Sequence, residues 1–178
     1  ITVRGKKYLE KADVIIYAGS LVNPVLLDET KGGCRIYNSA KMTLEEVIDE
    51  MVKAEESGKV TVRLHTGDPC LYGAIREQMD ILDEKNISYD VCPGVSSFSG
   101  AASALNLEYT LPNVSQSVII TRMAGRTPVP EREEIASFAA HHATMVIFLS
   151  TGMLEQLSER LMEGGYEKDT PAAIVYKA

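Results

Sequence analysis

The segment LHTGDPCLYG, residues 64–73, places small and polar residues directly after an apolar run. Asp68 and Pro69 suit the start of a helix, because Asp is a favoured N-cap and Pro fits the first helical position. A cap does not require the two preceding residues, Thr66 and Gly67. Gly67 permits close approach to the backbone, and Asp68 offers an acceptor for ribose or amino groups. The segment therefore predicts a binding loop as well as a helix start.

A second loop, CPGVSSFSGAASA at residues 92–104, follows another apolar run. Pro93 and Gly94 predict a turn, and Ser96 and Ser97 bring hydroxyl groups to the N-terminus of a helix. The small residues that follow fit a ligand site or a tightly packed structural helix. In open α/β sheets, ligands bind beyond the carboxyl ends of the strands, where loops of this kind lie. Together, the two loops favour a nucleotide-like ligand.

Two arginines, Arg122 and Arg126, flank a glycine in the segment TRMAGRTPVPE at residues 121–131. Arginines in loops are often only solvated. If these two face a cleft, their planar guanidinium groups suit carboxylates. The second interpretation predicts a polyanionic substrate.

Several common catalytic motifs are absent. The chain has no G-x-S-x-G, no Walker-type G-x-x-x-x-G-K-[ST] and no G-x-G-x-x-G after a strand. Cys70 and His65 are close in sequence, but this spacing does not distinguish a catalytic pair from chance. We therefore expect a reaction that needs little covalent help from the protein.

Composition and charge disfavour some classes of partner. The net charge of -7 and the lack of a Lys/Arg block disfavour nucleic acid. Three cysteines without a C-x-x-C, and a His141-His142 pair that does not match them, predict reduced thiols and no structural zinc. No apolar run reaches the roughly 18 to 20 residues that span a bilayer. These features predict a cytoplasmic protein with no membrane partner.

Alternating strand-like and helix-like runs predict an α/β fold with a largely parallel sheet. The expected strands are residues 13–18, 34–38, 59–65, 88–92, 117–122, 143–150 and 172–178. Three expected helices are residues 2–12, 42–58 and 152–165. The second begins with a Thr43/Glu46 capping box, and the third is expected to bury Leu154. Two further helices are expected, one directly after Asp68 and one that begins near Ser96.

Pro112 and Asn113 interrupt this pattern before a strand that no helix precedes. We therefore expect two α/β domains, residues 1–112 and 113–178. Both ends of the chain look cut, since Ile1 opens into a helix and Ala178 closes a strand. A sheet without its first strand would expose an apolar edge, so residues are expected to be missing on both sides.

The chain resembles the tetrapyrrole methylases, which use S-adenosylmethionine. The resemblance rests on TGDPCLYG (66–73), PGVSSFSGAASAL (93–105) and TPAAIVYKA (170–178), in this order, and it covers the whole chain. Within the family, VRLHTGDPCLYGAIREQM and TRMAGRTPVP look like the members that methylate carbon 11 of precorrin-4 or its cobalt complex.

The resemblance implies two α/β domains with the cofactor between them, a corrin substrate with several carboxylates, and a homodimer. It implies S-adenosylhomocysteine as the product of the cofactor and no metal held by the protein. The implied cofactor-binding residues are Thr66, Gly67, Asp68, Leu71, Tyr72, Ser96, Ser97, Leu149 and Ala178. Arg122 and Arg126 are the candidates for the substrate carboxylates, with His65 near the cleft, and no residue is assigned as the proton acceptor.

One departure from the family concerns the ends. The family begins with a strand and a G-x-G-P-G-D-P loop before the position of Ile1, and it continues beyond Ala178. Without these parts, weak binding and poor turnover are expected. Alternatives are another precorrin position, a protein side chain or RNA ribose as acceptor, or a non-catalytic cofactor-binding or dimerisation fragment.

Overall fold

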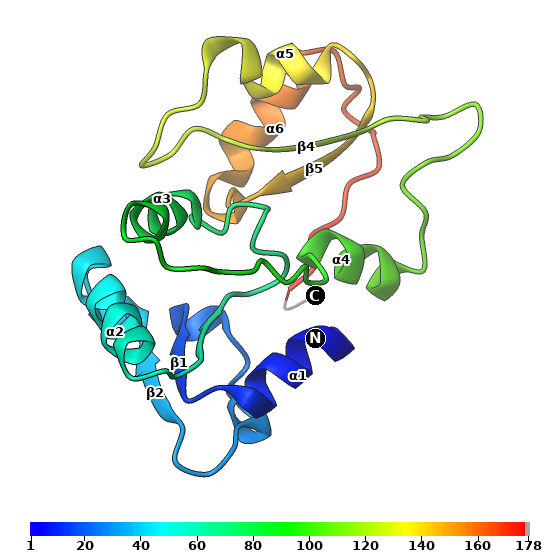
Figure 1. Ribbon diagram of the computed structural model, residues 1–178. Coiled ribbons are helices and arrows are strands. Elements are labelled where there is room, and N and C mark those ends of the chain that lie inside the picture. The colour runs from blue at the N-terminus through cyan, green and yellow to red at the C-terminus, as the bar shows by residue number, and fades with distance from the viewer. Residues whose placement is uncertain (177–178) are drawn as a thin grey trace. The chain divides into compact units, whose positions relative to one another are not determined.

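Strand β1 (Val14–Tyr17) is the centre of a three-stranded sheet in which all pairings are parallel. The computed structural model describes residues 1–176 (Figure 1). The other strands are β2 (Arg35–Asn38), β3 (Thr61–Leu64), β4 (Val118–Arg122) and β5 (Thr144–Phe148). The α-helices are α1 (Val3–Lys11), α2 (Leu44–Glu56), α3 (Arg76–Glu84), α4 (Ser97–Leu105), α5 (Ile135–Ala139) and α6 (Leu154–Glu163).

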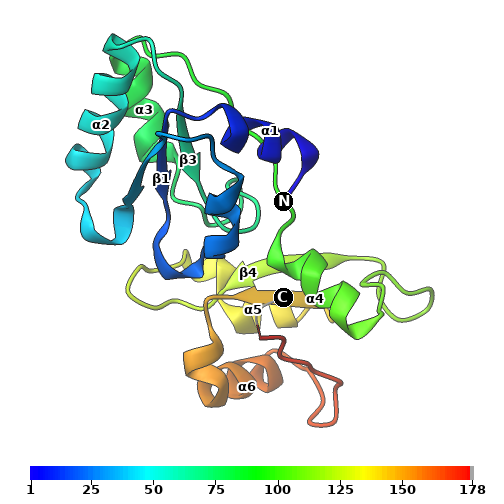
Figure 2. The same ribbon diagram turned by 90° about the horizontal axis from the view of Figure 1, so that it is seen from below.

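Both faces of β1 are covered, as expected for a central parallel strand. Ile15 packs with Leu9 and Ala12 on the α1 side. Val14 and Ile16 point to the other face, where α2 and α3 lie (Figure 2). All three strand residues are fully buried, so an apolar run without alternation is what this strand requires.

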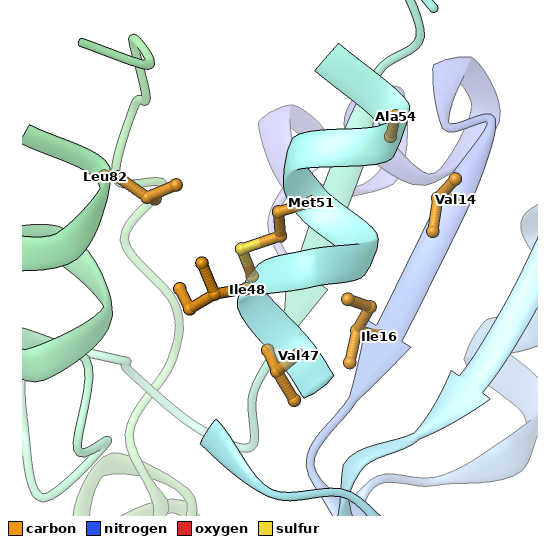
Figure 3. Close-up of a cluster of buried hydrophobic side chains, with 7 residues drawn as sticks. All are labelled: Val14, Ile16, Val47, Ile48, Met51, Ala54 and Leu82. Carbon is orange, nitrogen blue, oxygen red and sulfur yellow. The ribbon is translucent and has the colours of Figure 1, made fainter. Parts of the chain in front are cut away.

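The main core lies between β1, α2 and α3. Figure 3 shows α2 with Val14 and Ile16 on one side and Leu82 of α3 on the other. The α2 side chains in this cluster are Val47, Ile48, Met51 and Ala54. Their spacing places them on one helical face. The sequence pattern predicted Val47, Ile48 and Met51 on that face, together with Leu44 and Val52, which are only partly buried, and it did not include Ala54.

The expected capping box at the start of α2 is confirmed. The Glu46 N–H donates to Thr43 Oγ1 (3.2 Å), and the Thr43 N–H donates to Glu46 Oε2 (2.8 Å). Thr2 caps α1 in a similar way, since its Oγ1 accepts from the Gly5 N–H (3.1 Å). Two helix starts in the first half of the chain were therefore readable from local residue types.

A second, two-stranded sheet is formed by β4 and β5, which are also parallel. Arg122 pairs with Phe148 in the register, so the segments following both strands leave the same edge of the sheet. Helix α5 contacts both α6 and β4. The prediction of an α/β fold with parallel sheets is confirmed.

The chain divides into two compact units, residues 1–97 and 98–178. The boundary expected after Pro112 lies inside the second unit, before β4. The division into domains 1–112 and 113–178 stays a prediction.

Two expected strands are wrong. Residues 88–92 and the described part of the last one, residues 172–176, form no strand. A strand needs a neighbouring backbone as partner, and neither segment pairs with one among the described residues. Side chains hold the first segment instead: the Tyr89 hydroxyl donates to Asp83, and Asp90 accepts from Arg4 and Tyr8 of α1.

The helix expected directly after Asp68 is also displaced. Residues 69–72 form a turn, and α3 begins only at Arg76. The last helix, α6, forms as expected but with Leu154 exposed rather than buried. Periodicity identified both helices, whereas the start of α3 depends on the loop conformation described next.

Candidate functional site

The first candidate loop follows β3 in the first unit. Thr66 and Gly67 are exposed, and Gly67 adopts a φ of 61°, which favours glycine. The carboxylate of Asp68 is engaged on both oxygens. Oδ1 accepts from the Cys70 N–H (2.8 Å), and Oδ2 accepts from the Gly94 N–H (3.1 Å). Asp68 therefore caps a single turn and joins its loop to the second candidate loop.

Residues 93–97 lie against this loop at backbone distance. A Cβ added to Gly94 would collide with the Gly67 carbonyl oxygen, and a Cβ on Gly67 would lie 3.4 Å from Ser96 Cα. Ser96 is buried, whereas Ser97, the first residue of α4, is exposed. The structure thus brings together five predicted cofactor residues: Thr66, Gly67, Asp68, Ser96 and Ser97. The close approach expected at Gly67 is made by the neighbouring loop.

The turn after Asp68 contains two residues in the left-handed region, Tyr72 (φ 56°) and Ala74 (φ 50°). Each such conformation costs of order 1 kcal/mol for a residue with a Cβ. Tyr72 is 43% exposed and Leu71 is half-buried. The two predicted cofactor residues thus occupy a strained turn, which explains why no helix starts at Asp68.

His65 lies at the end of β3, immediately before the loop. Its Nε2 is buried without a hydrogen-bond partner among the described residues. Burial, assisted by the positive charge of Arg63, lowers the pKa of His65 to about 4. The imidazole is therefore neutral at pH 7 and supplies no positive charge for substrate carboxylates.

Cys70 is exposed, next to Asp68. Desolvation and the hydrogen bond to Asp68 raise the pKa of the Cys70 thiol. A thiol that stays protonated is a weak nucleophile. The sequence spacing left open whether Cys70 and His65 form a catalytic pair, and the raised pKa of the thiol disfavours Cys70 as a nucleophile.

In the second unit, the two predicted substrate arginines differ. Arg122, at the end of β4, donates to the carbonyl oxygens of Met123 (3.1 Å), Thr127 (3.1 Å) and Pro128 (2.8 Å). Its guanidinium group thus organises the loop that follows. Arg126 is exposed and makes no hydrogen bond or ion pair within the described part of the chain. Only Arg126 is left with all its donors for a ligand.

Leu149 follows β5 with a φ of 55° and is 69% exposed. The next residue, Ser150, is buried and joins the two strand ends. Its hydroxyl donates to the Phe148 carbonyl (2.7 Å) and accepts from the Met123 N–H (3.1 Å). Sequence reasoning missed Ser150, although a serine ending an apolar strand was an available signal. Ala178, the last predicted cofactor residue, lies outside the described residues.

Residues 1–176 contain no group of three or more His, Cys, Asp or Glu side chains placed to hold a metal ion. Within the same residues, no helix combines the length and apolarity needed to cross a bilayer.

The contact between Gly67 and Gly94 gives a direct test. We expect Gly94→Ala to destabilise the protein by about 1 to 3 kcal/mol, because backbone atoms cannot rotate away from the added methyl group. Urea unfolding measures this loss. Gly125→Ala is the matched control, since a Cβ there meets no atom within 4 Å. Equal midpoints for the two variants would contradict the contact.

The neutral state of His65 predicts a pH effect. Because its pKa is lowered in the folded state, the unfolded state binds more protons between pH 6.5 and pH 4, and stability falls as pH falls through that range. His65 should contribute about 2 kcal/mol of the loss between pH 7 and pH 5. Urea unfolding of His65→Gln should show a correspondingly smaller loss. An unchanged pH dependence would show that His65 titrates normally.

Comparison with known proteins identifies relatives that match this chain over its full length. The chain is 56% identical to cobalt-precorrin-4 C(11)-methyltransferase of Methanocaldococcus jannaschii, over 100% of this chain and 69% of the relative. An X-ray structure of cobalt precorrin-4 methyltransferase, a cobalamin biosynthetic enzyme, matches with a TM-score of 0.92 and 42% identity, covering 95% of this chain and 71% of the other.

A more distant relative is the chloroplastic S-adenosyl-L-methionine-dependent uroporphyrinogen III methyltransferase of Arabidopsis thaliana. It is 30% identical over 98% of this chain and 49% of its own length. The sequence profile of one family matches all of residues 1–178. With this match and the 56% identity, the chain belongs to the tetrapyrrole (corrin/porphyrin) methylases.

Proposed function

We propose that this protein is an S-adenosylmethionine-dependent methyltransferase that methylates carbon 11 of precorrin-4 or cobalt-precorrin-4 in cobalamin biosynthesis. The observation that carries the proposal is the match to the Methanocaldococcus relative along the entire chain. The choice of precorrin-4 over another corrin precursor depends on that relative and on the solved methyltransferase structure.

The paired loops of the first unit are suited to a nucleoside-type cofactor. Thr66, Gly67 and Ser97 present exposed polar groups, and Val95 and Tyr72 add exposed apolar surface nearby in sequence. We propose that these loops hold S-adenosylmethionine, and that Leu71 and Ser96 support them. The assignment of Leu149 and Ala178 to the same cofactor depends on the sequence resemblance.

S-adenosylmethionine supplies an activated methyl group, so the protein needs no nucleophile of its own. On transfer, the carbon–sulfur bond would break with its electron pair left on sulfur, the electron-rich ring carbon would form the new bond to the methyl group, and the methylated macrocycle would release a proton. Alignment of donor and acceptor is the main contribution of the protein, worth up to about 7 to 11 kcal/mol as effective molarity. The raised pKa of the Cys70 thiol fits a mechanism without a covalent enzyme intermediate. We also propose that the protein holds no metal of its own.

The substrate carries several carboxylates, and we propose that Arg126 binds one of them. Arg126 is exposed and its guanidinium donors are unused among the described residues. Arg122 acts indirectly, by holding the loop carbonyls around Arg126 in place. His65 is neutral at pH 7, so we assign it no ion pair with a substrate carboxylate.

We further propose a homodimer in the cytoplasm. Helix α4 contains no buried residue although it is mostly apolar, which supports a partner for that helix. The three cysteines are free in the described chain, which suits a reducing compartment. Neither point depends on the assigned reaction.

Titration calorimetry and mass spectrometry test the reaction. We expect the 178-residue chain to bind S-adenosylmethionine and S-adenosylhomocysteine, and cobalt-precorrin-4 to gain the mass of one methyl group after incubation with enzyme and cofactor. An isotope-labelled methyl group followed by NMR would locate the modified carbon. Failure to bind either cofactor form would overturn the proposal, and methylation at another ring carbon would correct the substrate.

Arg126→Ala should raise the KM for the corrin substrate about tenfold, as expected for the loss of one charge-assisted contact. The cofactor Kd should stay within about twofold, because no predicted cofactor residue changes. Arg132→Ala, which removes another exposed arginine, is the control. Equal losses of substrate and cofactor binding in Arg126→Ala would discredit its role.

A further inference from the structure

Arg63 is the one charged residue of strand β3, between Val62 and Leu64. It lies on β3, paired in register with Ile16 of β1, and its side chain is half-buried. The guanidinium group forms no ion pair among the described residues. Burial lowers the pKa of Arg63, so the position is costly for a cation. A charge kept at such a position needs a reason beyond packing.

Three neutral oxygens from three different elements surround this guanidinium group. Nη1 donates to the Ile16 carbonyl (2.9 Å), Nη2 to Ser39 Oγ (2.9 Å) and Nε to Gln78 Oε1 (3.1 Å). Ser39 lies in the short 3₁₀ helix after β2, and Gln78 lies in the first turn of α3. Arg63 thus joins the ends of two strands to the start of α3.

Gln78 extends the connection to the candidate cofactor loop. Its Nε2 donates to the Ala74 carbonyl (3.2 Å), immediately before α3. The orientation of the amide follows from chemistry, because arginine can only donate and a carbonyl can only accept. Ala74 is one of the two residues of this turn in the left-handed region, and Tyr72 is the other.

No side chain caps α3 at its N-cap residue, Ile75. A Gln at the third helical position usually reaches back to the N-cap N–H in a capping box. Gln78 occupies that position but binds Arg63 and Ala74 instead. The sequence therefore uses this side chain to hold the turn, and not to complete the helix start.

We propose that Arg63 and Gln78 are positioning residues that hold the strained turn at Leu71–Ala74 in the conformation required to bind the cofactor. The inference rests on the proposed function for the identity of the cofactor, S-adenosylmethionine. Neither side chain needs to touch it. Their effect passes through the hydrogen bond from Gln78 to Ala74.

Two substitutions of Gln78 distinguish its hydrogen bond with Arg63 from its hydrogen bond with Ala74. Gln78→Glu keeps an acceptor for Arg63 but cannot donate to the Ala74 carbonyl. Gln78→Leu loses both hydrogen bonds. The control is Gln156→Leu, because Gln156 is exposed, occupies the same third position of α6 and makes no hydrogen bond among the described residues.

Titration calorimetry with S-adenosylhomocysteine should give a Kd about tenfold higher for Gln78→Glu and for Gln78→Leu, and an unchanged Kd for Gln156→Leu. Thermal unfolding should show Gln78→Glu as stable as the parent. A purely structural role would instead lower stability in proportion to affinity. Parental affinity in Gln78→Glu would overturn the inference.

Hydrogen–deuterium exchange reports on the turn without any ligand. Peptides covering residues 70–79 should exchange faster in both Gln78 variants, while peptides covering β1 stay unchanged. Unchanged exchange in the turn, or faster exchange throughout the chain, would overturn the inference. Absence of cofactor binding by the parental chain would instead overturn the proposed function, so the two failures are distinguishable.

Discussion

Two loops of the first unit meet backbone against backbone, and the absence of a side chain at Gly94 makes that contact possible, because a Cβ there would collide with the Gly67 carbonyl oxygen. Asp68 closes it, since its carboxylate accepts from the Gly94 N–H. Because the backbones lie so close, polar groups of both loops reach one surface, with Thr66 and Ser97 exposed and Ser96 buried between them. Where the loops touch, position 94 has no room for a Cβ, so the contact requires glycine there.

Residues with positive φ follow strands in each of the two units. Tyr72 and Ala74 follow β3, Leu149 follows β5, and all three have positive φ. Residues in such conformations persist only when surrounding contacts impose them. Side chains outside the loops supply those contacts: Gln78 binds the Ala74 carbonyl, and Ser150 joins the ends of β4 and β5. In each unit, the conformation of the strained loop therefore depends on a side chain that need not touch any ligand.

Three arginines, Arg63 in the first unit and Arg122 and Arg126 in the second, have different roles although they are chemically identical. Arg63 and Arg122 each donate to neutral oxygens of the protein and hold neighbouring segments together. Arg126 remains exposed. Since guanidinium groups have five donors in a fixed geometry, they serve as well for joining backbone segments as for binding carboxylates. Only the positions of nearby carbonyl groups decide between the two uses.

Local patterns in the sequence determined the α/β class, the parallel strands β1 to β5, and the starts of α1 and α2, because periodicity and capping depend on neighbours within a few residues. The two loops whose residue types suit ligand binding could also be predicted from contiguous residues. The same contiguous motifs indicated the family. Tertiary structure alone decided that Asp68 binds Gly94, that α3 starts at Arg76, that residues 88–92 form no strand, and that Arg122 turns back to its own loop. The first and third of these depend on backbone partners that are distant in sequence. The start of α3 and the contacts of Arg122 depend on the exact backbone path of a loop, which residue types alone do not determine.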